Sequence, residues 1–180
     1  MSNRHRNPRG WSVTFSSRVL AQVAMPLAAL VTACATPPPA PGTSRDEVLQ
    51  AWGRPTARYA MAGGVERLEY ATGPFGRTTW MIDLDGSGHV QLARQVLNEA
   101  EFLQVQIRAG SGGLMRDELL RWIGTPGERR GGGWAGGEVW SWRYPTNDCL
   151  WFQASVADDG RVTSAAFGTD PVCDAPSGRR

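Results

Sequence analysis

The sequence predicts an α+β protein made of two tandem units, each a helix followed by a three-stranded antiparallel sheet, behind a signal peptide and a proline-rich tether. Three features that recur along the chain carry this prediction. A helix with its stop signal, a strand bearing a tryptophan and a glycine turn each occur twice, at a nearly constant spacing. The spacing is longer than the period of solenoid repeats, which is roughly 20 to 50 residues, so it indicates a duplicated domain.

Residues 1–33 have the order of a bacterial lipoprotein signal. Four arginines precede an apolar run over residues 19–31, and the small pair Thr32-Ala33 leads directly to Cys34. An apolar run of about 13 residues is too short for a membrane span, which needs roughly 20, and is typical of a signal peptide. The resemblance to lipoprotein signals implies that residues 1–33 are removed and that Cys34 becomes the lipidated first residue.

The residues after Cys34 bear on where such a protein is held. Ala35 stands where some bacterial lipoproteins carry an aspartate that retains them in the inner membrane, so we expect the periplasmic face of the outer membrane. Residues 34–43 contain four prolines and are expected to form an extended tether that holds the folded part off the bilayer.

The charge balance excludes several functions. All four arginines of residues 1–33 leave with the signal, so 15 basic and 17 acidic residues remain, a net charge of −2. That balance gives no basic footprint for nucleic acid. The chain contains no lysine, which excludes Walker-type phosphate loops and Schiff-base chemistry.

Apart from the lipidated cysteine, the chain has two cysteines, Cys149 and Cys173. An even number of remaining cysteines is typical of an exported protein with disulfides. A bridge between them would close a loop of about 25 residues and contribute roughly 3 kcal/mol. The alternative is a pair of buried free thiols.

The first unit is expected over residues 44–97. Ser44 and Glu47 form a capping box at the start of a helix, which Gly53 and Pro55 end. Three strands are expected to follow, over Val65–Tyr70, Thr78–Leu84 and Val90–Leu97.

The second unit is expected over residues 98–173, with a tail over 174–180. It adds a leading helix, capped by Asn98, that the first unit lacks. A second helix over 116–123 ends at Gly124 and Pro126. The constant spacing matches Trp151 to Trp80. The expected strands are Glu138–Tyr144, Leu150–Val156 and Arg161–Phe167.

The repeated pattern resembles the BamE/SmpA/OmlA type of outer-membrane lipoprotein domain. The resemblance lies in the helix Arg-Asp-Glu-Val-Leu-Gln-Ala-Trp-Gly-Arg-Pro, in a strand with Leu68 and Tyr70, in the turn Gly88-His89-Val90, and in their counterparts in the second unit. It implies two helices packed on a three-stranded antiparallel sheet. Tandem copies resemble the fold of the secreted β-lactamase inhibitor protein. Family members with one domain assist β-barrel assembly, whereas this chain has two copies.

The chemistry expected of an enzyme is not assembled by these residues. His89 has no ligand neighbours at metal spacing, and the acid pairs Glu66/Glu69 and Asp158/Asp159 fit solvated strand edges or turns. Asp83 opens a calcium-like loop whose twelfth position is Arg94, opposite in charge to the required glutamate. We therefore expect no catalytic residue, no metal, no cofactor and no small-molecule substrate.

Aromatic residues are the most distinctive feature of the second unit. One strand places three of them on one face, which indicates either core packing or, with neighbouring residues, a recognition surface. The candidate partner-binding residues are Trp134, Trp140, Trp142, Arg143 and Tyr144.

These observations predict a lipid-anchored protein that contacts another envelope protein in β-barrel-assembly-type biogenesis or in envelope integrity. The alternative is an inhibitor-like module that binds a periplasmic enzyme with the joined sheets of the two units.

Overall fold

The computed structural model describes residues 36–72, 77–133 and 136–174. Several predictions fall on residues outside these ranges. They are the signal peptide over 1–33, the lipidated Cys34, the loop residue Trp134 and most of the tail over 174–180.

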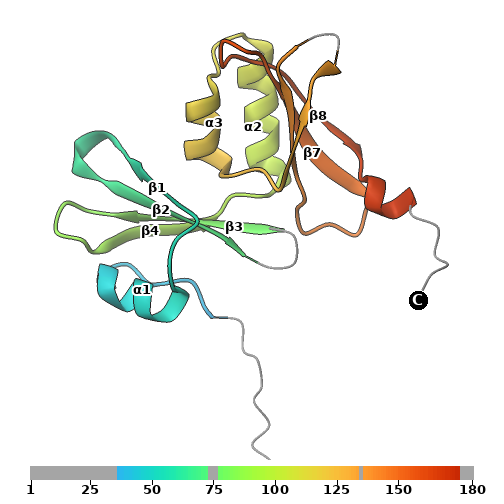
Figure 1. Cartoon of the computed structure of the whole chain (residues 1–180). Helices are drawn as coiled ribbons and strands as arrows, with labels where there is room; N and C mark the ends of the chain where they lie inside the picture. Colours follow the sequence, from blue (N-terminus) through green and yellow to red (C-terminus); the bar gives the residue numbers. More distant parts are fainter. Residues whose placement is uncertain (1–35, 73–76, 134–135, 175–180) are drawn as a thin grey trace, which may run out of the picture. The chain divides into compact units, whose positions relative to one another are not determined.

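The first unit packs one helix against a four-stranded antiparallel sheet (Figure 1). Helix α1 (Arg45–Trp52) begins with the predicted capping box, in which the Ser44 N–H donates to Glu47 Oε2 over 2.8 Å. Gly53 ends the helix at a φ of 74°. The sheet has the order β1 (Ala57–Ala60), β2 (Glu66–Thr72), β3 (Thr78–Leu84) and β4 (Val90–Gln95), with a short 3₁₀ turn, Ala62–Gly64, between β1 and β2.

The second unit carries two helices on one face of another four-stranded antiparallel sheet (Figure 1). The leading helix α2 (Glu99–Gly110) begins as predicted, because Asn98 Oδ1 accepts the N–H of Glu101 over 3.1 Å. The remaining elements are α3 (Arg116–Ile123), β5 (Glu128–Gly131), β6 (Glu138–Trp142), β7 (Leu150–Val156), β8 (Val162–Thr169) and the 3₁₀ turn Pro171–Asp174.

The α+β class is confirmed, but each sheet has four strands and not three. The extra strands β1 and β5 are short, with sequences Ala-Arg-Tyr-Ala and Glu-Arg-Arg-Gly. They contain no β-branched residue, and runs this short give little periodic signal. Both lie at a sheet edge, where charged side chains are common because they discourage pairing with other chains.

Some hydrogen bonds of the first unit have equivalents at matching positions of the second unit. Tyr70 Oη donates to the Gly53 carbonyl over 3.0 Å, and Trp142 Nε1 donates to the Gly124 carbonyl over 3.0 Å. In each unit a side chain of the second strand therefore satisfies a carbonyl just past the end of a helix, where no intrahelical donor remains.

The second unit contains one residue more than the first, and the position of this extra residue corrects one predicted match. The offset from the start of β2 to the start of β6 is longer by one residue than the offset from the start of α1 to the start of α3. The insertion lies in the turn after β5, because the bond from Met61 N to the Val65 carbonyl corresponds to the bond from Gly132 N to the Gly137 carbonyl.

Trp80 is therefore equivalent to Phe152 and not to Trp151. Trp80 pairs with Tyr70 across β2 and β3, and Phe152 pairs with Trp142 across β6 and β7. The sequence placed Trp151 there because a fixed spacing ignores the inserted residue.

The second unit packs on the first sheet by the face that α1 does not cover. Met81 of β3 belongs to the same buried cluster as the core of the second unit. Beside it, Arg67 Nη1 donates to the Arg121 carbonyl at the end of α3 over 2.7 Å. The two four-stranded sheets remain separate, but the two units pack together into one compact folded part.

Candidate functional site

The C-terminal end of the second unit is fastened by the predicted cysteine pair. Cys149 and Cys173 form a disulfide with their Cα atoms 5.9 Å apart. Backbone bonds hold the same end, since Asp170 N donates to the Cys149 carbonyl over 3.0 Å and Cys173 N to the Asp170 carbonyl over 2.9 Å. The 3₁₀ turn Pro171–Asp174 thereby returns the chain to the start of β7.

Three of the predicted partner-binding residues are core residues. Trp140, Trp142 and Tyr144 are 2%, 1% and 5% exposed. They belong to the buried cluster under α2 and α3, where the rings of Phe102 and Tyr144 meet edge to face at 5.2 Å. Of the two interpretations that the sequence left open, core packing is the one that the burial supports.

Arg143 is also held within the protein. Its Nε and Nη2 donate to the two carboxylate oxygens of Asp170 over 2.6 and 2.9 Å, and its guanidinium lies 5.1 Å from the ring centre of Trp151. Arg130 lies over the same ring at 5.2 Å. The hydrogen bonds that Arg143 donates to Asp170 raise the pKa of Arg143, and the same bonds lower the pKa of Asp170.

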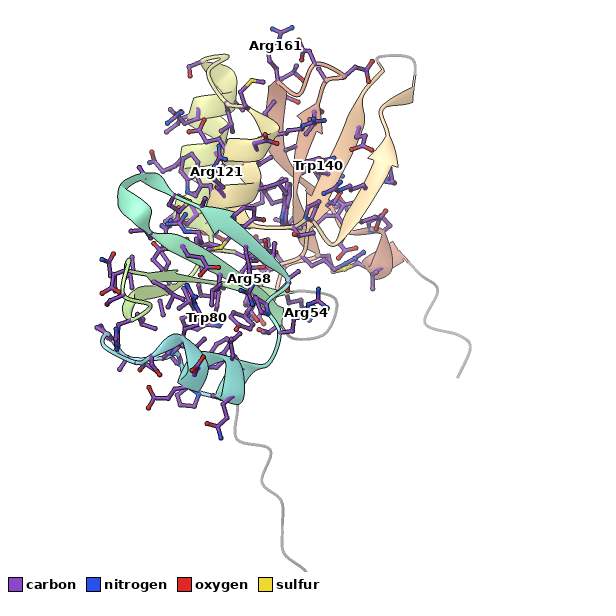
Figure 2. The ribbon with its side chains drawn as sticks, turned by 60° about the vertical axis from the view of Figure 1, so that its left-hand side comes forward. Arg54, Arg58, Trp80, Arg121, Trp140 and Arg161 are labelled. Atoms are coloured by element: carbon purple, nitrogen blue, oxygen red, sulfur yellow. A yellow bond between two sulfur atoms is a disulfide. The ribbon has the colours of Figure 1, made fainter. Side chains whose placement is uncertain are left out.

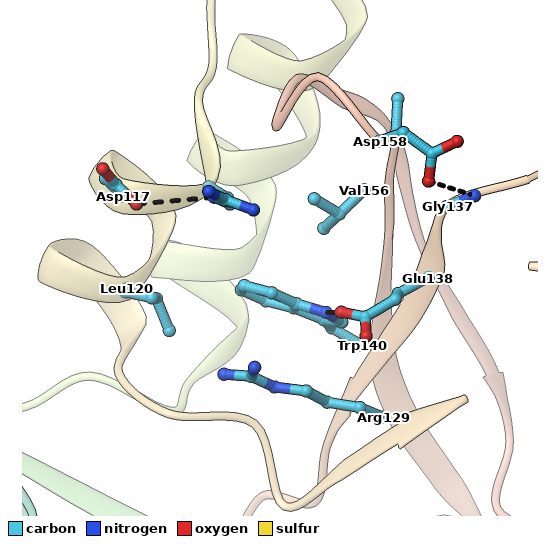
Figure 3. A pocket seen from close by; sticks show the side chains of 10 residues that line it. Asp117, Leu120, Arg129, Gly137, Glu138, Trp140, Val156 and Asp158 are labelled. Atoms are coloured by element: carbon cyan, nitrogen blue, oxygen red, sulfur yellow. Dashed lines mark hydrogen bonds and ion pairs between the residues drawn. The ribbon is translucent and has the colours of Figure 1, made fainter. Parts of the chain in front are cut away.

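A cavity of about 520 Å³ opens between α3 and the sheet of the second unit (Figure 3). Its lining includes Arg116, Arg129, Glu138, Trp140 and Asp158. Of the predicted site residues that the structure describes, only Trp140 borders this cavity. Its indole is nearly buried, so the charged side chains around it form most of the accessible wall.

Two of the three acidic residues that line the cavity, Glu138 at the start of β6 and Asp158 in the turn after β7, lie close together. Gly137 has a φ of 68°, and a Cβ there would lie 2.2 Å from the Val156 carbonyl oxygen. Glycine is therefore required for this close approach of β6 to the end of β7. The approach lets Gly137 N donate to Asp158 Oδ1 over 3.0 Å, which places Asp158 beside Glu138 (Figure 3).

Trp140 separates these acids from an arginine. Its Nε1 donates to Glu138 Oε2 over 2.6 Å, and the Arg129 guanidinium lies 4.2 Å from its ring centre. Figure 3 shows Arg129 reaching from β5 along the indole toward α3, on the side away from Asp158. Among the residues that the structure describes, no carboxylate forms an ion pair with Arg129, and no cation forms one with Glu138 or Asp158.

In the first unit, charges at the same repeat positions neutralise one another. Arg45 and Arg58 correspond to Arg116 and Arg129, and Glu66 corresponds to Glu138. Glu66 forms ion pairs with both arginines, and its Oε1 lies 3.6 Å from Arg58 Nη1.

A substitution between the repeats accompanies this difference. Leu68 of the first unit is replaced by Trp140, whose N–H engages the glutamate in place of the arginines. Figure 2 shows Arg58 in the first unit and Trp140 in the second.

Sequence reasoning missed this cavity because it considered each charge alone. The detectable signal was the Arg/Arg/Glu triplet present in both repeats together with the change of Leu68 to Trp140. It also misplaced Glu69, which was expected at a solvated edge and has no exposed surface. Glu69 lies on a central strand whose outer face the second unit covers.

The remaining candidate sites have simpler roles. Asp85 Oδ1 accepts the N–H groups of Ser87 and His89, each over 2.9 Å, so the calcium-like segment forms a hairpin turn. The hydrogen bond from the Ser87 hydroxyl, which is the largest contribution, and these backbone bonds lower the pKa of Asp85. Within residues 36–72, 77–133 and 136–174, no cluster of three or more His, Cys, Asp or Glu side chains could hold a metal ion.

No protein-family model, no curated protein and no solved structure matches the chain significantly. No helix in the described part of the chain is both long enough and apolar enough to cross a membrane.

Proposed function

We propose that this chain is a lipid-anchored lipoprotein on the periplasmic face of the outer membrane, and that it acts by contact with another envelope protein. The observation that carries the proposal is the order of the N-terminal sequence, with basic, apolar and small residues leading to Cys34. A role in β-barrel-assembly-type biogenesis or in envelope integrity rests on the resemblance to BamE/SmpA/OmlA domains.

Two structural features support this proposal. The disulfide between Cys149 and Cys173 suits an oxidising compartment outside the cytoplasm. The tether is short, because Gly42 N donates to the Val90 carbonyl over 2.8 Å and so already belongs to the folded part. The chain between Cys34 and that point spans at most about 28 Å, so a lipid on Cys34 would hold the first unit near the bilayer.

The inhibitor-like alternative has lost its two main arguments. It required the sheets of the two units to be joined, and they are separate. It also required an exposed aromatic patch, whereas Trp140, Trp142 and Tyr144 are buried. We therefore propose the envelope lipoprotein alone.

The anchor is tested by Cys34→Ala in the full-length chain. We expect the variant to retain its leader, to lack lipid and to be absent from the outer-membrane fraction, whereas Cys149→Ala keeps both processing and location. Unchanged processing and fractionation of Cys34→Ala would refute the anchor. The partner is tested by photo-crosslinking from the exposed positions Arg129 and Asp158 in cells, followed by mass spectrometry. Crosslinks to no envelope protein would refute the contact role.

A further inference from the structure

We propose that the cavity of the second unit binds a dipolar ligand, with a carboxylate at Arg116 and Arg129 and a cationic nitrogen at Glu138 and Asp158. The inference rests on the proposed function only for the source of the ligand, which we assign to a partner protein. The ligand would then be a surface segment that presents one acidic and one basic side chain.

The first unit shows what the two arginines of such a site bind. At the equivalent positions, Arg45 and Arg58 share the carboxylate of Glu66. In the second unit the glutamate is held by the indole N–H of Trp140, which leaves room for a carboxylate from outside the unit. Guanidinium groups suit this role because their planar donors match the geometry of a carboxylate.

The acidic side of the cavity has no counterpart in the first unit. Asp158 stands where the first unit has Gly86, so the second unit carries an added negative charge. Within the described part of the chain, Asp158 and Glu138 accept hydrogen bonds only from the neutral donors Gly137 N and Trp140 Nε1. Each carboxylate keeps an oxygen for a cation, and the cationic group of a ligand would balance charges that no described cation pairs with.

The other charge on the lining does not close the site. Asp117 lies 3.7 Å from Arg116, with side chains that are 71% and 56% exposed. Ion pairs this exposed contribute little, because water and salt screen them. A ligand carboxylate can therefore compete for Arg116. The cavity of about 520 Å³ also falls in the usual range for ligand sites, about 300–1,000 Å³.

The test uses the full-length protein in mild detergent and a short peptide, blocked at both ends, with one glutamate and one lysine separated by a glycine. Binding is followed by NMR at the indole N–H of Trp140 and by calorimetry. We expect saturable binding that weakens about tenfold, or about 1.4 kcal/mol, when glutamine replaces the glutamate or norleucine replaces the lysine.

Matched variants locate the binding. Arg129→Gln and Asp158→Asn should each weaken it about tenfold, because each removes a charge that would pair with the ligand from an exposed side chain. Arg58→Gln, at the equivalent position of the first unit, and Asp159→Asn, in the same turn as Asp158, should leave it unchanged. Circular dichroism checks the fold of all four variants.

Three results would overturn the inference. Absence of saturable binding by the peptide would refute the site, and an equal loss in Arg58→Gln would place the binding elsewhere. Tighter binding of glycylglycine, a free zwitterion, than of the blocked peptide would refute the assignment to a partner protein. None of these results bears on Cys34, whose processing and fractionation test the lipid anchor separately.

Discussion

Glu69 of β2 accepts the backbone N–H of Thr125 over 2.8 Å, so a carboxylate of the first sheet caps the chain that leaves α3 in the second unit. The Thr125 hydroxyl donates to the other oxygen over 3.3 Å, and Tyr59 Oη donates to it over 2.6 Å. Glu69 has no exposed surface, so these donors replace the water that it would otherwise bind.

Glu69→Ala should destabilise the whole folded part. The change leaves the donors of Tyr59 and Thr125 without their acceptor, so we expect the free energy of unfolding to fall by roughly 3 kcal/mol. Urea unfolding at pH 7 measures it, with the exposed Glu99→Gln as the control at under about 0.5 kcal/mol. A fall of the same size in both variants would contradict a role for Glu69 in joining the units.

Gly124 and Gly53 offer a matched pair. They end equivalent helices at φ values of 84° and 74°, with an extended ψ that is essentially confined to glycine. A Cβ at Gly53 would meet nothing within 4 Å, whereas at Gly124 it would lie 2.8 Å from Thr79 Cγ2 and 3.1 Å from Glu69.

Gly53→Ala should therefore lower the free energy of unfolding by about 1–2 kcal/mol, through backbone strain alone. Gly124→Ala should lower it by about 1–3 kcal/mol more, because overpacking is added at the junction. Equal losses in parallel urea unfolding curves would show that the junction yields to the extra methyl group.

Asp170 predicts a pH dependence of stability. Hydrogen bonds from Arg143 hold its pKa below the ordinary value near 3.9 of an unfolded aspartate. The folded state thus favours the ionised carboxylate, whose contribution is complete above about pH 4 and is lost as the pH falls through the depressed pKa.

Asp170→Asn should cost about 2 kcal/mol at pH 7, because the largely buried Arg143 loses its ion pair with Asp170. At pH 2 the variant and the parent protein should be closer in stability. The exposed Asp148→Asn serves as the control. A difference between the Asp170→Asn variant and the parent that does not change between pH 7 and pH 2 would argue against the pairing.

The disulfide should stabilise the C-terminal end against unfolding. Reduction, or the double change of Cys149 and Cys173 to serine, frees a loop of about 25 residues and should cost roughly 3 kcal/mol. The melting temperature with and without reductant measures the effect, and the double serine variant, which has no disulfide to reduce, is the control in which reductant should change nothing. Identical melting curves before and after reduction would contradict it.

The predictable parts of the fold were those set by local chemistry. Ser44 and Asn98 cap helices because their side chains bond to backbone N–H groups a few positions on, and that depends on sequence neighbours alone. The edge strands β1 and β5 were missed since pairing with β2 and β6 decides them.

Long-range packing likewise determines which of the charged and aromatic residues are buried. Glu69 is buried by a segment far along the chain, which no local pattern reveals. The tryptophans of β6 were ambiguous because the alternation along a strand places side chains on one face of the sheet but does not show whether that face is buried. The charged cavity could have been found only by comparing the two repeats position by position.

The residue inserted after β5 lies at a hairpin turn, between Gly132 N and the Gly137 carbonyl that it binds. Placed inside β6, an extra residue would have turned Trp142 toward the opposite face, because side chains alternate along a strand. At the turn it leaves the paired side chains of β6, β7 and β8 facing as their counterparts do in the first unit. A hairpin can accordingly change in length between the repeats without reversing the faces of the strands that follow it.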